Sequence, residues 1–471
     1  MKRIVVLATL LAMVLGTASM AAAADLTATG SWKIFAQWTD NEDFSDNAGD
    51  VESDFDVRQR LRTQFNFTAN ENLMGALQIE IGSTEWGNPA GFTRFDADQT
   101  QIEVKSAYIN WVWPNTDIAF YAGLMPLALP AGAAGNPVLD NDVAAFVMSA
   151  PLTDNVSLLA GWARPYSHLW DAEEANTAMD ILFAAVPLSF DGVALTPYLA
   201  YGYSGEQFLQ GMVAGGNVNR YNAVGVGLLT SNNTLAMEED GSLSVWYGGL
   251  TFDLTMFDPI KLTASFIYGN SSAGQDNLDR SGWLADLAVS YTGFDFVTPE
   301  LFFSYSSGED GNSSEGNGDS ERLPTVGGDY GFGNYFFNSG GMAIDNGLQS
   351  VAQQMGNWQL GMNFKDISFL EGLTHSITIM YAQGTNDESI GDRFTGNDAV
   401  FGSVAYGRTL TDQDSIWEFS IVNQYKIYDQ LTATLGIGYI AADFDSDVWA
   451  TANNGDDDDA ARMTLGIEYK F

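Results

Sequence analysis

The chain has 471 residues, a formal net charge of −41 and no cysteine. So large an acidic excess repels phosphate and excludes nucleic acid as a partner, and the lack of cysteine excludes disulfides, thiolate metal sites and cysteine nucleophiles. Hydrophobic residues make up 46% of the chain and aromatic residues 13%, which is too much for a disordered acidic protein, so the sequence predicts extensive apolar contacts.

The N-terminal segment is typical of an export signal that is removed after translocation. Lys2 and Arg3 precede an apolar run that ends at Leu15, and a group of alanines follows. The run is short for a membrane span, and no basic cluster follows it. We therefore expect residues 1–24 to be a signal peptide and residues 25–471 to form one exported domain.

The rest of the chain alternates short strand-like segments with polar connections of two kinds. In the segments, apolar and polar side chains alternate, and very short links join eight pairs of them. Long polar stretches separate the pairs, and one further segment lies at each end, which predicts eighteen antiparallel strands with both termini on the short-turn side. The short links lie near residues 69–72, 114–115, 153–154, 191–192, 258–259, 293–295, 370–372 and 428–430.

This layout predicts an all-β, transmembrane, antiparallel up-and-down β-barrel with short periplasmic turns and long extracellular loops. A soluble sandwich would show the same alternation, so the prediction depends on the connection lengths. The apolar stretch 221–230 is left over, and we interpret it as part of the fifth long loop. If one hairpin were mispaired, sixteen strands would be the alternative.

The second predicted strand carries a basic row on one face. Arg58, Arg60 and Arg62 recur at a spacing of two residues, so their side chains point to the same side of the sheet. On the lipid side each would cost about 2–4 kcal/mol near the bilayer midplane, so the row must face the lumen. Lys33 on the first strand and Lys105 on the fourth could extend it.

The fourth predicted strand has an inconsistent pattern. Glu103 and Lys105 share their parity with Ile109 and Trp111, which would put charged and large apolar side chains on one face. A β-bulge midway along the strand would resolve this conflict.

The last strand carries a resemblance to known proteins. Residues 463–471 alternate apolar and polar side chains and resemble the C-terminal insertion signal of outer-membrane barrels, with Tyr469 and Phe471 on the apolar face. With the export signal and the loop rhythm, the chain resembles the general porins of Gram-negative bacteria. Its opening Ala24–Trp32 is similar to the homotrimeric porins of sulfate-reducing bacteria. The resemblance implies a homotrimer of independent pores in the outer membrane.

The resemblance also implies a constriction. In such porins the third long loop folds into the lumen, and here residues 127–142 are unusually apolar and small for an external loop. We expect this loop to place Asp140 and Asp142 opposite a basic wall formed by the arginine row, creating a transverse field that orients dipolar solutes. The alternatives are a surface loop or a trimer contact, and an arginine row that lies near the mouth of the pore.

No pattern in the sequence indicates bond chemistry. His168 and His375 are isolated, and the chain has no G-x-S-x-G or H-E-x-x-H motif. We expect no enzymatic activity, catalytic residue, cofactor or metal site. Acidic runs such as Asp456–Asp459 are interpreted as a solvated rim, with cation-bridged contact to lipopolysaccharide phosphates as the sharper hypothesis.

The sequence therefore predicts a passive channel for small hydrophilic solutes and ions across the outer membrane, in contact with outer-membrane lipids and lipopolysaccharide. A substrate-selective barrel for sugars or organic acids is the first alternative. A plugged structural or adhesive barrel is the second.

Overall fold

A computed structural model describes most of the predicted strands. The apolar stretch 221–230, His168, Asp456–Asp458 and the predicted signal peptide up to residue 23 lie outside the described residues. Among those described, no helix is long and apolar enough to cross a bilayer. The described residues are 24–44, 53–86, 102–166, 178–205, 242–272, 279–311, 320–338, 341–344, 348, 355–389, 406–407, 409–453 and 459–471.

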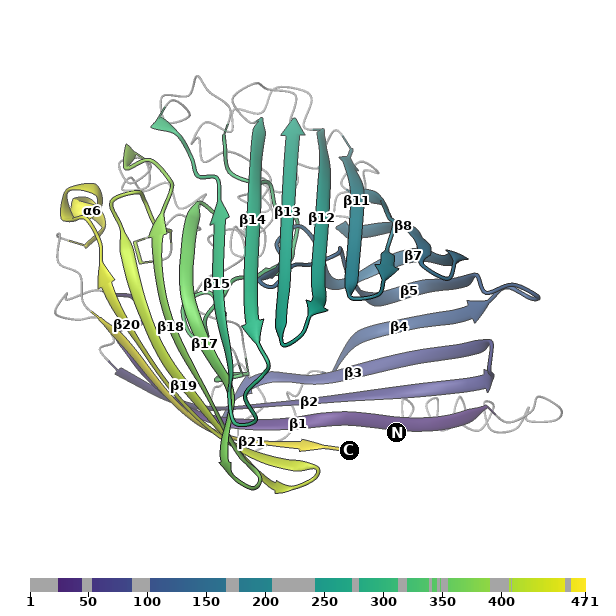
Figure 1. Cartoon of the computed structure of the whole chain (residues 1–471), viewed down its shortest axis with the longest axis horizontal. Coiled ribbons are helices and arrows are strands. Elements are labelled where there is room, and N and C mark those ends of the chain that lie inside the picture. Colours follow the sequence, from purple (N-terminus) through teal and green to yellow (C-terminus); the bar gives the residue numbers. More distant parts are fainter. Residues whose placement is uncertain are drawn as a thin grey trace, which may run out of the picture.

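One antiparallel sheet closes on itself where β1 (Asp25–Asp40) pairs with β21 (Ala460–Lys470) (Figure 1). The sheet has 19 segments, but β9 (Met179–Ala185) and β10 (Leu188–Phe190) are two pieces of one strand, which is interrupted at Val186 and Pro187. The barrel therefore has eighteen strands, which confirms the prediction.

The remaining strands follow one another around the barrel as antiparallel neighbours, and two short strands, β6 and β16, form a separate sheet. Their bounds are β2 (Ser53–Asn70), β3 (Leu73–Glu85), β4 (Glu103–Val112), β5 (Ala119–Ala128), β6 (Gly135–Asn136), β7 (Asp140–Thr153), β8 (Val156–Tyr166), β11 (Val193–Ser204), β12 (Leu243–Phe257), β13 (Ile260–Ser272), β14 (Arg280–Tyr291), β15 (Thr298–Ser306), β16 (Asp329–Tyr330), β17 (Asn357–Leu370), β18 (Leu373–Gly384), β19 (Ser415–Tyr428) and β20 (Leu431–Asp443). A short helix, α6 (Ser446–Asn453), follows β20.

The connections follow the predicted rhythm. Each of the eight predicted short links joins two paired strands, and the long connections lie at the opposite strand ends. Asn115, Gly192 and Gly372 adopt positive φ angles of 61°, 70° and 78° in three of these turns, which fits the preference of tight turns for asparagine and glycine.

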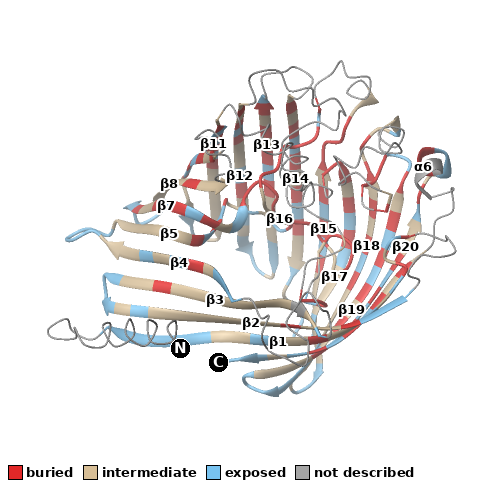
Figure 2. Ribbon diagram, turned by 180° about the vertical axis from the view of Figure 1, so that it is seen from behind, coloured by how far each residue is buried: buried red, intermediate tan, exposed pale blue. Residues whose placement is uncertain are grey.

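Along each strand, side chains that point into the lumen alternate with side chains that point outward. On β14, Leu284 and Asp286 are buried, whereas Leu287, the residue after Asp286, is 37% exposed. Figure 2 shows that buried residues gather on β11–β20 and are sparse on β1–β4. Something inside the barrel therefore covers one side of the lumen and leaves the other accessible.

The bulge expected in the fourth strand is present. Ser106 pairs with Gln78 and Val104 pairs with Ile79, so Lys105 is the extra residue in the ladder. This shift lets Glu103 pair with Glu80 while Ile109 keeps its place on the exposed outer face.

Candidate functional site

The third loop folds into the lumen, as predicted. Between β5 and β7, the backbone N–H of Ala133 donates to Asp286 Oδ1 on β14 over 2.8 Å. The side-chain amide of Asn136 donates to the Tyr198 hydroxyl on β11 over 3.1 Å. Val138 and Leu139 are buried with exposures of 0% and 1%. The loop thus lies against the inner surface of strands on another side of the barrel.

Asp286 is the main anchor of this loop. Its second carboxylate oxygen accepts a short hydrogen bond from the Ser265 hydroxyl on β13. Gly132 passes so close that a Cβ there would collide with Asp286 and Ser265. The apolar, small composition that the sequence shows at 127–142 is therefore needed for close packing inside the lumen.

The seventh long loop joins β15 to β17, and its described residues 320–338 also enter the lumen, which was not predicted from the sequence. Glu418 on β19 is fully buried and accepts the backbone N–H groups of Asn334 at 2.6 Å and Phe336 at 2.9 Å. The Phe332 ring stacks on Phe302 of β15 at 4.2 Å between centroids. The available signal was a glutamate, Glu418, between the apolar outward residues Trp417 and Phe419, at an inward position where a buried charge needs partners.

The two infolded loops are joined to each other. β6 of the third loop pairs with β16 of the seventh, and the Gly331 N–H donates to the Ala134 carbonyl over 2.8 Å. A second bond runs from the Asp140 N–H to the Gly327 carbonyl over 2.9 Å. Backbone pairing of this kind makes the loops one body inside the barrel.

A cluster at the barrel seam ties the seventh loop to the first loop. Glu42 Oε1 accepts from Arg462 Nη2 at 2.6 Å and from the Tyr335 hydroxyl at 3.1 Å, and the Arg462 guanidinium lies 4.5 Å from the Tyr335 ring centroid. Burial, with the nearby Glu42 carboxylate, raises the pKa of the Tyr335 phenol above its ordinary value. The phenol therefore stays protonated and keeps donating to Glu42.

The infolded body covers only part of the lumen wall. Inward residues such as Ile181, Val245 and Met380 are buried to 1% exposure or less. On β1 and β2, by contrast, the inward side chains of Lys33 and Arg62 keep 26% and 32% of their surface accessible. The accessible passage therefore runs along the wall formed by the first strands.

The arginine row lines this accessible wall. Across the β1–β2 ladder, Arg60 lies opposite Lys33, and Arg62 lies opposite Ser31, so these side chains share the inward face. Arg62 forms an ion pair with Glu80 on β3, and Arg58 lies 3.1 Å from Asp56. Lys33 lies 3.9 Å from Glu468 on β21. The acids are interleaved with the bases on the same wall. Asp56 shares the parity of the arginines in the sequence, whereas Glu80 and Glu468 lie on other strands and were not predicted, because cross-strand register is not readable from one strand.

The other three proposed constriction residues lie elsewhere. Lys105 and Asp142 form an ion pair with each other. Asp140 and Asp142 share the β7 face of Phe146, which is 43% exposed, while Val143 takes the buried inward face. The register of β7 therefore turns both carboxylates away from the arginine row. In these positions Asp140 and Asp142 do not create the expected electric field across the lumen.

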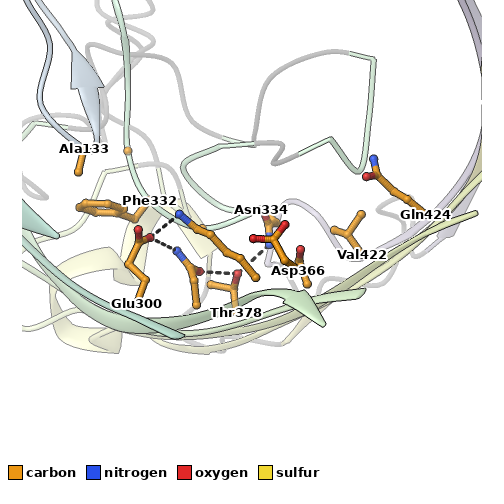
Figure 3. Close-up of a pocket in the computed structure, with 13 residues that line it drawn as sticks. Ala133, Glu300, Phe332, Asn334, Asp366, Thr378, Val422 and Gln424 are labelled. Atoms are coloured by element: carbon orange, nitrogen blue, oxygen red, sulfur yellow. Dashed lines mark hydrogen bonds and ion pairs between the residues drawn. The ribbon is translucent and has the colours of Figure 1, made fainter. Parts of the chain in front are cut away.

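A polar cavity of about 340 Å³ lies on the short-turn side of the infolded body (Figure 3). Glu300 on β15 accepts from Lys365 Nζ at 2.6 Å and from Asn363 Nδ2 at 3.0 Å, both on β17. Thr378 on β18 donates to Asn363 Oδ1 over 2.7 Å. The turn of the seventh loop at 331–334 closes the cavity from above. Solute that passes the loops would meet this hydrogen-bonding surface.

The two residues of the proposed insertion signal lie on the outer face. Phe471 exchanges both backbone hydrogen bonds with Gly30, at 2.9 and 3.0 Å, and so helps to close the barrel. Tyr469 and Phe471 are 46% and 42% exposed, with ring centroids 5.6 Å apart. Their part in membrane insertion stays a prediction.

No family model matches the chain, and no curated protein matches it. Among solved structures, the outer membrane protein OprD from Pseudomonas aeruginosa is similar, with a TM-score of 0.50, 13% identity and coverage of 94% of this chain and 93% of that one. OccK7 (OpdD) from the same organism gives a TM-score of 0.48 at 12% identity, covering 95% and 99% of the two chains. The likeness to OprD shows that the chain has the fold of an outer-membrane β-barrel.

Proposed function

We propose that this protein is a substrate-selective diffusion channel of the outer membrane. The observation that carries the proposal is the joined body of the third and seventh loops, which leaves a passage against the charged wall of β1–β3. The sequence predicts a passive channel for small hydrophilic solutes that one infolded loop narrows. Such an unselective channel fits this arrangement less well, because two loops instead of one narrow the lumen.

The charges of the accessible wall favour small dipolar or carboxylate-bearing solutes. Lys33, Arg58 and Arg62 each lie within ion-pair distance of an acid. The wall therefore presents positive and negative side chains side by side and has little net charge. A sugar channel would need aromatic rings stacked along the lumen. The ring row formed by Trp358, Tyr381 and Trp417 alternates with buried residues and lies on the outer face instead.

The solute class is tested by adding solutes to single channels in planar bilayers. Saturable block of the ion current by a small carboxylate or zwitterion, with none by an uncharged disaccharide of similar size, is the expected result. Equal passage of both without block would restore the unselective pore. Purified protein that carries no current would support the plugged structural barrel instead.

The arginine row has its own electrical test. Arg60→Glu reverses one charge on the accessible wall, so we expect the reversal potential under a salt gradient to move toward cation preference. Lys426→Glu makes the same charge change at the short-turn end of β19, where the lysine is 56% exposed, and should move it much less. Equal shifts in the two variants would remove the row from the constriction.

Export through residues 1–24, assembly as a homotrimer and contact with lipopolysaccharide belong to the same proposal. The N-terminal sequence pattern supports export, and the outward apolar belt of a membrane barrel supports contact with lipid. The homotrimer rests on the resemblance to homotrimeric porins. Conductance that opens in triplet steps would support the trimer. Solitary steps of one size would count against it.

A further inference from the structure

Two charged residues point out of the barrel close to the long-loop rim. Arg164 lies on the β8 face of Trp162, whereas Ala163 between them is fully buried in the lumen. Asp180 on β9 likewise alternates with the buried Met179 and Ile181. An outward arginine costs little only near the membrane interface, which matches its place two residues from the loop end of β8.

The pair has a defined geometry. Arg164 donates from Nε to Asp180 Oδ1 at 2.7 Å and from Nη2 to Oδ2 at 2.8 Å. Trp162 Nε1 donates to the same Oδ1 at 3.1 Å, and its ring lies 5.3 Å from the guanidinium carbon. The two bonds from Arg164 to Asp180 use two of the five N–H donors of the guanidinium and fix its orientation. The Arg164 side chain is 38% exposed.

An apolar groove of about 580 Å³ begins directly below this pair on the outer wall. Across β8, β9, β11 and β12, the register aligns Trp162, Leu182, Tyr201 and Trp246 in one row. The next row toward the short turns holds Ala160 and Ala184, whose small side chains form the floor. Leu199 at 66% exposure and Leu182 at 58% form its walls.

We propose that this surface binds one phosphate-bearing lipid of the outer leaflet, with an acyl chain in the groove and the phosphate on Arg164. The groove is apolar and open along its length, which suits a hydrocarbon chain. The aromatic row marks the interface, where Trp and Tyr rings gather. Arg164 lies one pleat above it, roughly 7 Å along the strand, at headgroup height. Three N–H donors of the guanidinium remain beyond the two that Asp180 accepts, and they can meet a phosphate while Asp180 orients the group.

The test is native mass spectrometry of the full-length channel in detergent, titrated with dioleoyl-phosphatidylglycerol or with dioleoylglycerol, which lacks the phosphate. We expect saturable binding of the phospholipid and at least about tenfold weaker binding of the neutral lipid. Arg164→Ala should remove the difference between the two lipids. Ala184→Trp fills the groove and should weaken both.

Ala285→Trp is the matched control, because Ala285 lies on the outer face of β14 between the buried Leu284 and Asp286, away from the groove. It should leave lipid binding unchanged. Equal binding of both lipids to the parent, or equal loss in both tryptophan variants, would overturn the proposal. A further check uses Leu199→Cys in this cysteine-free chain. Efficient thiol cross-linking between chains in the membrane would show that a second copy covers the groove, and the lipid proposal would fail.

Discussion

Glu418→Ala is expected to enlarge the pore by releasing the seventh loop. The fully buried carboxylate accepts the backbone N–H groups of Asn334 and Phe336, so its truncation removes the acceptor of both bonds. One of these donors is buried and the other is part-buried, so the loss of both bonds costs on the order of 2 kcal/mol or more. We expect a larger single-channel step, noisier current and weaker block by small carboxylates.

The control for this variant is Asp253→Ala on β12. Asp253 is an exposed carboxylate that accepts from the Thr263 hydroxyl at 2.7 Å. Both variants remove one acid, so a change caused by net charge alone would appear in both. If Glu418→Ala left the step size at the level of the parent while the protein folded as a barrel, the seventh loop would not set the width of the passage.

Asp286→Ala is expected to have the second largest effect, through the third loop. This carboxylate holds the Ala133 N–H and the Ser265 hydroxyl, so its loss frees the tip of the loop from β13 and β14. The loop keeps its backbone pairing with the seventh loop and the bond from Asn136 to Tyr198. The increase in conductance should therefore be smaller than for Glu418→Ala.

The two variants should also be coupled. Because β6 and β16 join the loops, each anchor partly holds the loop that the other variant releases. The double variant should therefore raise conductance by more than the two single effects combined, since neighbours that share a structural unit are not additive. Additive effects on conductance would mean that the loops move independently.

The barrel was largely predictable from the sequence. Alternation at period two and the contrast between turns such as Asp191-Gly192 and the long loops gave eighteen strands with the observed turns. The bulge at Lys105 could also be predicted, because a charged residue shared the parity of Ile109 and Trp111. These features depend on local geometry and on the contrast between lipid and water, which each strand records by itself.

The pore interior was predictable only in part. The composition of residues 127–142 indicated an infolded loop, and the spacing of Arg58, Arg60 and Arg62 placed them on an inward face. The acids expected opposite them were placed differently, because the facing of Asp140 and Asp142 depends on where β7 begins in the ladder. The entry of the seventh loop depends on a contact between Glu418 and Asn334, 84 positions apart, which no local pattern encodes.

The sequence by itself thus determined a lipid-facing barrel, its strand count and the side on which the loops lie, because each of these follows from short-range patterning of apolar and polar residues. Only the tertiary structure decided which wall stays open, which acids pair with the arginines and that two loops join inside the lumen. These features arise from cross-strand register and from contacts between distant segments, which form only when the barrel closes.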